Sequence, residues 1–321
     1  MPATTRKFVR GPAIFIFLVL VLVGEASSLP PRQETKKDEL SYNISVSAIS
    51  IAVTVLDKEG RFVNDLTQKD FTVYENNAKQ TINYFKHDFN APISLTVLLD
   101  VSGSMELQDK LKESKEALIH LLTNILSPQD EVSLLIFADG EVEVASKFFT
   151  DKTEFLKVLE RTGAYGQTAL NDAVAVSPEY ANKGKNEKRA LLLITDGIEN
   201  DSQYSPDQAV EVAKKVDVPI YTIGYKIPLN EQYLKKHKRG EALTTAGIIG
   251  SLEKFSRATG GKAFFINQPN EYAIVLSEIK RELSHHYIIG YTSYKSPKKE
   301  YRRIRVVTSN KKYRVRTREG Y

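Results

Sequence analysis

The chain of 321 residues contains no cysteine and no tryptophan, and it has only two methionines and five histidines. The lack of cysteine excludes disulfides, thiolate zinc sites, iron–sulfur clusters and a cysteine nucleophile. Any chemistry must therefore use oxygen ligands, hydroxyl groups, carboxylates or basic groups. Hydrophobic residues make up 41% of the chain and charged residues 26%. This ordinary composition excludes a largely disordered chain and a protein with many membrane spans.

The N-terminal segment has the order of a secretory signal peptide, with basic residues first, an apolar run over residues 13–23 and small residues after it. We expect a signal peptide over residues 1–28, a polar linker over 29–40, and a secreted, periplasmic or cell-envelope protein. An uncleaved membrane anchor is the alternative, although this apolar run is short for a bilayer. Export without cysteine favours a bacterial protein, because eukaryotic secreted domains of this size usually carry disulfides.

Residues 92–284 alternate between apolar strands and helices. Segments such as 93–99 and 190–195 are nearly continuous apolar runs, which is typical of strands buried on both faces of a parallel sheet. The segments between them, such as 107–126, have apolar residues at helical spacing. This alternation predicts an α/β domain with a doubly wound, mostly parallel, Rossmann-like sheet.

Strand patterns without helices flank this domain, over residues 41–91 before it and 285–321 after it. Each flanking segment is too small to form a core alone, because independent stability needs three or more strands with a covered face. We therefore expect the two segments to pair into one small all-β domain, with the α/β domain inserted between them.

Three loops of the α/β domain carry oxygen-bearing side chains. One directly follows the strand at 93–99 and reads D-V-S-G-S, one precedes a helix and reads G-Q-T, and one follows the strand at 190–195 and reads D-G. In an open α/β sheet, ligands bind beyond the carboxyl ends of the strands. Oxygen-only ligation suits a hard divalent cation, with Mg²⁺ as the first choice and Mn²⁺ or Ca²⁺ as alternatives. The candidate ligands are Asp100, Ser102, Ser104, Thr168 and Asp196.

Each loop alone is also explained by turns and helix caps. Taken together, their order and placement resemble the metal-ion-dependent adhesion site of von Willebrand factor type A domains, and the flanking strands resemble the bacterial secreted proteins related to that family. The resemblance implies that Asp100, Ser102 and Ser104 bind the metal through side-chain oxygens. It also implies that Thr168 and Asp196 approach it directly or through water, and that a partner supplies an acidic group.

We therefore expect an exported, non-enzymatic module for protein binding or adhesion, whose divalent cation coordinates an exposed acidic residue of a protein partner. A structural or assembly protein of the cell envelope that uses another surface is one alternative, and a metal-dependent hydrolase is another. Against the hydrolase, aspartyl-phosphate phosphatases need a second aspartate two residues after the first, where this chain has Ser102. The chain also lacks a phosphate-binding loop motif and a G-x-S-x-G serine motif.

Basic residues gather in residues 294–321, which contain eleven lysines and arginines and two acidic residues. Arg314, Arg316 and Arg318 share one face of the last expected strand. This pattern is either a solvated strand face that hinders edge pairing or a patch for anionic glycans or lipid headgroups. Nucleic acid is not expected as a partner of an exported protein. A second basic segment, over 225–245, is either a partner-binding loop or a surface insertion.

Overall fold

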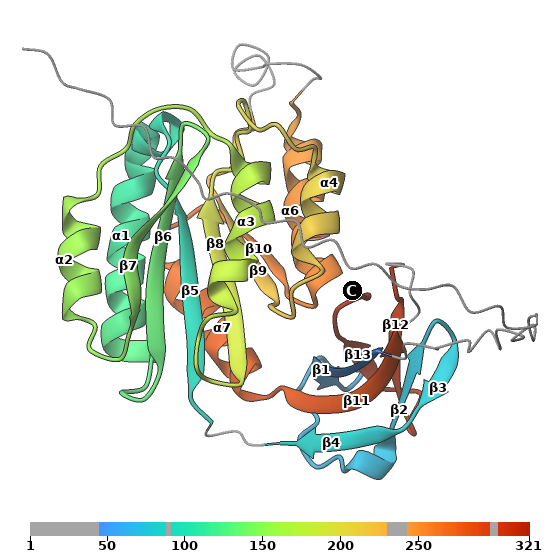
Figure 1. Ribbon diagram of the computed structural model, residues 1–321. Coiled ribbons are helices and arrows are strands. Elements are labelled where there is room, and N and C mark those ends of the chain that lie inside the picture. Colours follow the sequence, from blue (N-terminus) through green and yellow to red (C-terminus); the bar gives the residue numbers. More distant parts are fainter. Residues whose placement is uncertain (1–44, 88–90, 230–242, 296–300) are drawn as a thin grey trace, which may run out of the picture. The chain divides into compact units, whose positions relative to one another are not determined.

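In the computed structural model, a six-stranded sheet lies between two sets of helices (Figure 1). The structure describes residues 45–87, 91–229, 243–295 and 301–321. The strand order is β10-β9-β8-β5-β6-β7, and every neighbouring pair is parallel except β6 and β7. The strands are β5 (Ile93–Asp100), β6 (Glu131–Ala138), β7 (Glu141–Phe149), β8 (Lys188–Thr195), β9 (Ile220–Tyr225) and β10 (Ala263–Ile266). The predicted doubly wound, mostly parallel sheet is confirmed.

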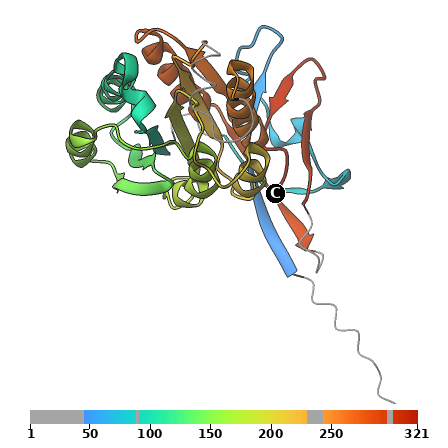
Figure 2. The ribbon, with the colours of Figure 1, turned by 90° about the horizontal axis from the view of Figure 1, so that it is seen from above.

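Each face of this sheet has its own apolar core. Among the described residues, three helices cover each face, and Figure 2 shows the helices on both sides of the sheet. Alternate residues of a buried strand point to opposite faces, so the strands need apolar residues at nearly every position. One face is covered by α1 (Lys110–His120), α2 (Thr153–Arg161) and α7 (Glu271–Ser284). The other is covered by α3 (Leu170–Ala181), α4 (Pro206–Ala213) and α6 (Thr245–Thr259).

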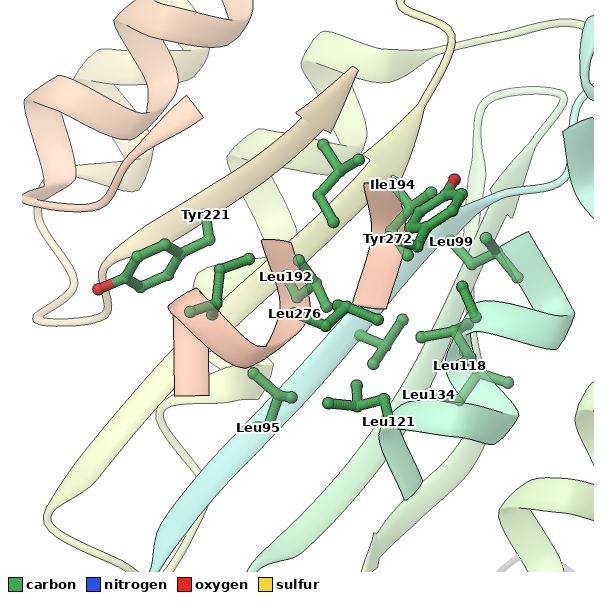
Figure 3. Close-up of a cluster of buried hydrophobic side chains, with 14 of the residues drawn as sticks. Leu95, Leu99, Leu118, Leu121, Leu134, Leu192, Ile194, Tyr221, Tyr272 and Leu276 are labelled. Atoms are coloured by element: carbon green, nitrogen blue, oxygen red, sulfur yellow. The ribbon is translucent and has the colours of Figure 1, made fainter. Parts of the chain in front are cut away.

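Figure 3 shows the core beneath α1 and α7. Leu99 of β5 and Leu192 of β8 lie in one buried cluster with Leu118 of α1 and Leu276 of α7. These side chains are almost fully removed from water, and each such leucine stabilises the fold by roughly 1.5–3 kcal/mol relative to exposure. This packing holds the sheet and its loops in a fixed arrangement.

The strand segments on the two sides of the α/β domain pair with each other. β1 (Ser45–Leu56) runs antiparallel to β11 (Tyr287–Lys295), which directly follows α7. One sheet has the order β13-β1-β11-β4 and a second has the order β12-β2-β3. Apolar side chains of both sheets form a third core. The predicted insertion of the α/β domain in a small all-β domain is confirmed. The remaining strands are β2 (Phe71–Glu75), β3 (Ala78–Gln80), β4 (Ile82–Lys86), β12 (Ile304–Thr308) and β13 (Arg314–Arg316).

Several elements differ from the expected ones. Strand β7 was not predicted, although it adds an antiparallel edge to the sheet. The helix expected from residue 107 begins at Lys110, because Gln108 and Asp109 have positive φ angles that end the short 3₁₀ segment η2 (Gly103–Asp109). After α1, the chain makes a single π turn, η3 (Leu121–Ile125), before it leaves the helix. The short 3₁₀ segment η1 (Gln68–Asp70) precedes β2.

Some sequence predictions fall on residues that the structure does not describe. The signal peptide at 1–28, the linker at 29–40 and most of the basic segment at 225–245 lie outside the described residues. Within the described ranges, no helix is both long enough and apolar enough to cross a membrane.

Ion pairs join the last strand of the β domain to the α/β domain. Arg316 of β13 pairs with Glu282 of α7, and Arg318 pairs with Asp217 at 3.3 Å. Glu282 and Arg318 are buried. These two arginines, expected on a shared basic face with Arg314, are therefore engaged by acidic groups of the same chain. The exposed basic surface that remains is smaller than the sequence alone indicated.

Buried His286 lies where α7 passes into β11. Its Nε2 atom is 3.3 Å from the Tyr221 hydroxyl on β9. Burial, with the nearby positive charges of Lys188 and His285, lowers the pKa of His286 from 6.5 to about 3. The imidazole is therefore neutral in the folded protein near neutral pH.

Buried Glu75, at the end of β2, connects the two sheets of the β domain. Its carboxylate accepts hydrogen bonds from Tyr291 at 2.9 Å, Ser293 at 2.8 Å and Tyr321 at 2.7 Å, and it pairs with Arg302 at 2.5 Å. Burial acts to raise the pKa of Glu75, but these hydrogen bonds outweigh it and hold the pKa below 4.5. A charged Glu75 is therefore part of the folded β domain.

We expect His286 to make the protein less stable as the pH falls from 7 to 5. The pKa of His286 is lower in the folded state, so the unfolded state binds more protons in this range and stability is lost on acidification. The loss from this group is about 2 kcal/mol over that interval. Urea unfolding of the wild type and His286→Gln at both pH values measures it. The variant should lose less stability than the wild type, whereas His120→Gln, at an exposed position of α1, should follow the wild type; equal losses in all three would contradict the assignment.

We expect Glu75→Gln to destabilise the protein by about 3 kcal/mol, because the substitution leaves the guanidinium of Arg302 without its buried counter-charge. Urea unfolding at pH 7 measures the change. Glu59→Gln removes the same charge from an exposed pair with Arg61 and should cost at most about 1 kcal/mol. Equal effects of the two substitutions would show that the buried network does not hold the sheets together.

Candidate metal centre

Asp100 and Asp196 meet because they end neighbouring parallel strands. Leu99 of β5 lies opposite Ile194 of β8, so the two chains leave the sheet at the same edge. The Thr195 hydroxyl donates a hydrogen bond to Asp100 Oδ2 at 2.6 Å, and the Ser102 amide donates to Asp100 Oδ1 at 2.9 Å. The first and third loops are therefore joined through the carboxylate of Asp100.

The second loop is hydrogen-bonded to the first. The Gly103 amide donates to the Gly166 carbonyl at 3.0 Å, and the Tyr165 amide donates to the Val101 carbonyl at 2.8 Å. Gly166 has a φ of +69°, and a Cβ atom there would lie 2.2 Å from the carboxyl group of Asp139. Only glycine therefore allows this close approach. The Asp139 carboxylate in turn accepts a hydrogen bond from the Gln167 amide at 2.6 Å.

Thr168 is also hydrogen-bonded to the third loop. Its amide donates to Asn200 Oδ1 at 2.8 Å, and its carbonyl accepts from the amides of Asn200 and Asp201. All three loops are thus held by a continuous set of hydrogen bonds at the carboxyl end of the sheet. Asp139 and Asn200 were missed in the sequence, because isolated Asp and Asn residues in loops usually serve turns.

The five predicted ligands differ in exposure. Asp100, Ser102 and Asp196 are 0% exposed and Thr168 is nearly as buried, whereas Ser104 is partly exposed. The Ser102 and Ser104 hydroxyl oxygens are 3.2 Å apart. Burial, together with the negative charge of Asp196, raises the pKa of Asp100 to about 7. Two carboxylates buried this close to each other call for a positive charge beside them.

One positive charge is supplied by Lys110, the first residue of α1. Its ammonium group forms a salt bridge with Asp196 Oδ2, and its side chain is only 4% exposed. Asp196 Oδ1 accepts a hydrogen bond from the Ile198 amide at 3.0 Å. Sequence reasoning missed Lys110, because a lysine at the edge of an amphipathic helix is normally placed in solvent. The pattern held no signal that this lysine points inward.

The residues present fit a divalent cation. The donors are carboxylate and hydroxyl oxygens, which Mg²⁺ prefers. Two carboxylates and one ammonium leave one uncompensated negative charge if both acids are ionised. Asp100, Ser102, Ser104, Thr168 and Asp196 would hold the cation. In the part of the chain that the structure describes, no three Asp, Glu or His side chains gather as metal ligands, here or elsewhere, so this centre would depend on its hydroxyl groups as well as its two carboxylates.

Comparisons with known proteins agree with this architecture. The family model for the von Willebrand factor type A domain matches residues 94–254, which is half of the chain. An uncharacterized protein of Borreliella burgdorferi is 22% identical over 211 residues, covering 60% of this chain and 59% of that protein. An uncharacterized protein of Synechocystis is 28% identical over 177 residues, covering 54% of this chain and 40% of that protein. The chain thus spans less than two thirds of each relative.

Among solved structures, a von Willebrand factor type A protein of Catenulispora acidiphila is similar to this chain, with a TM-score of 0.48 and 11% identity. The match covers 81% of this chain and 70% of that one. The family match covers β5, β6, β8 and β9 together with the three loops at their carboxyl ends. This chain therefore belongs to the von Willebrand factor type A domain family.

Proposed function

We propose that this protein is an exported binding protein that takes up a divalent cation, with Mg²⁺ as the first choice. The proposed ligands of the cation are Asp100, Ser102, Ser104, Thr168 and Asp196. Through this cation it binds an exposed acidic residue of a protein partner. Domains of this family are often involved in protein interaction and adhesion and are generally non-catalytic. The proposal extends that general role to a metal-dependent one.

The observation that carries the proposal is the pair of fully buried carboxylates, Asp100 and Asp196, at the shared end of β5 and β8. Burying two acids together is costly unless cations compensate them. Hydroxyl and amide groups and the ammonium of Lys110 contact these carboxylates, and a hard divalent cation is the ligand that such oxygen donors favour.

Charge also favours an acidic partner. With both acids ionised, a bound divalent cation and the ammonium of Lys110 bring the centre to a net charge of +1. When bound, the cation would supply a Lewis-acidic centre for a carboxylate of the partner, and the two carboxylates Asp100 and Asp196 would be the only charged groups of the proposed ligand set. The resulting net positive charge would attract an anionic group.

The N-terminal segment supports the export part of this proposal. The order of basic, apolar and small residues in the first 28 positions supports a signal peptide.

An assembly role in the envelope, using another surface, is the second candidate function. The observation in its favour is the exposed basic surface that includes Lys311, Lys312 and Arg314, which suits anionic glycans or lipid headgroups.

We expect the wild-type protein to bind Mn²⁺ or Mg²⁺ saturably and Asp100→Asn to bind at least tenfold more weakly. The substitution keeps the shape of the side chain and removes one of two ligand charges. Isothermal titration calorimetry measures the affinity. Asp207→Asn, which removes a charge from an exposed pair with Lys254, should bind like the wild type. Absence of saturable binding in the wild type would refute the metal-dependent function.

Chelator sensitivity separates the two candidate functions. We expect immobilised wild-type protein to capture a partner from an envelope extract in the presence of Mg²⁺ and to release it when EDTA is added, because the acidic group of the partner binds through the cation. Asp100→Asn should capture little of the same partner, and Asp207→Asn should capture it normally. Capture that is unaffected by EDTA and by Asp100→Asn would instead support the assembly role.

A further inference from the structure

Lys110 occupies an unusual position for a lysine. It is the first residue of α1, where the unpaired backbone amides give the helix end a partial positive charge that disfavours cations. Its side chain is also almost completely buried, and removing a charged group from water is costly unless it is paired. Neither the helix nor the core therefore explains a lysine here. The salt bridge between Lys110 and Asp196 compensates both costs.

A second lysine nearby shows the contrast. Lys226 lines the same pocket of about 540 Å³ as Lys110, with Leu107 and Pro228 also in its wall. Its ammonium group pairs with Glu113 of α1 at 2.5 Å and its side chain is 19% exposed. Lys226 thus has the same charge as Lys110 and lines the same pocket. Within the described part of the chain, however, it contacts none of the five predicted metal ligands. It provides a natural control for Lys110.

From these contacts we infer that Lys110 is a built-in counter-ion of the metal centre. In the metal-free protein its ammonium group neutralises Asp196, and a divalent cation must compete with it for that carboxylate. This inference rests on the proposed metal site but concerns a residue outside the ligand set. The pocket beside Lys110 offers space into which the ammonium group can turn when the cation binds Asp196.

Two consequences follow for metal binding. Removal of the ammonium charge should strengthen the affinity for the divalent cation, because the cation no longer faces a like charge beside its ligand. The same removal should weaken the metal-free fold, because Asp196 then remains buried without a counter-charge. Lys110 is therefore a positioning residue that sets how readily the centre exchanges its metal.

The test measures Mn²⁺ affinity of the full chain by calorimetry and by electron paramagnetic resonance of free Mn²⁺. We expect Lys110→Met to bind Mn²⁺ at least tenfold more tightly than the wild type, and Lys226→Met to stay within threefold of it. Lys110→Gln keeps a hydrogen-bond donor without the charge, and it serves if the methionine variant does not fold without metal; it should also bind more tightly. Affinities of both Lys110 variants within threefold of the wild type would overturn the inference.

The same experiment distinguishes this inference from the proposed function. Wild-type binding with unchanged affinity in the Lys110 variants leaves the proposed function intact and overturns the inference alone. Binding that appears only in the Lys110 variants supports the inference and refutes metal-dependent function in the wild type. Binding in none of the proteins overturns both.

Thermal unfolding in EDTA provides an independent measure. Lys110→Met should lower the unfolding midpoint, and adding Asp196→Asn to it should recover part of the loss, because the unpaired carboxylate is then removed. A double variant that is less stable than Lys110→Met would contradict the counter-ion role. Lys226→Met combined with Asp196→Asn should show no such recovery.

Discussion

Two carboxylates buried together at the end of a parallel sheet are the constraint on which the site depends. β5 and β8 are neighbours, so Asp100 and the Asp196 loop leave the sheet side by side. Hydrogen bonds from Thr195 and from backbone amides, together with the ammonium group of Lys110, compensate the buried negative charges. The rigid apolar packing on both faces of the sheet keeps these groups in register, since close-packed cores resist small displacements.

The β domain is joined to the α/β domain at the C-terminal end of α7. α7 runs directly into β11, whose strand pairs with β1 from the other side of the α/β domain. Because the two flanking segments must meet to complete a sheet, the inserted domain has to bring its own ends close together. The ion pair between Glu282 and Arg316 holds α7 to β13 at this junction. Neither flanking segment has enough strands to bury a core without the other.

The sequence alone predicted the architecture well, because the relevant signals are local and strong. Continuous apolar runs predicted the buried parallel strands, and the flanking segments predicted the composite β domain. Strand β7 was missed even though Val142 and Val144 alternate with acidic residues, because the strand lies at the edge of the sheet and is mostly exposed, so it has no continuous apolar run. The start of α1 was misplaced because positive φ angles at Gln108 and Asp109 leave no hydrophobic signature.

The site was predictable only in part, for a physical reason. Ligand types and their order along the chain are visible in sequence, but the direction of a long charged side chain is not. Lys110, Arg316 and Arg318 all look like solvated surface residues, and each instead forms an ion pair with an acid of another element. Such pairs join residues far apart in the chain, so a single sequence contains no periodicity that reveals them. The sequence therefore overstated how many basic residues of the C-terminal segment are exposed and unpaired.

Contacts connect the candidate metal centre to the β domain through helices. α1 begins with Lys110 on Asp196, and one turn later Ser114 lies 2.7 Å from the hydroxyl of Tyr272 on α7. The other end of α7 carries Glu282, which pairs with Arg316 of the β domain. A displacement of Lys110 from Asp196 would act on the first turn of α1, and the next turn contacts α7 through Ser114. Lys110 thus lies at the start of a series of contacts that leads from the metal centre through α1 and α7 to the β domain.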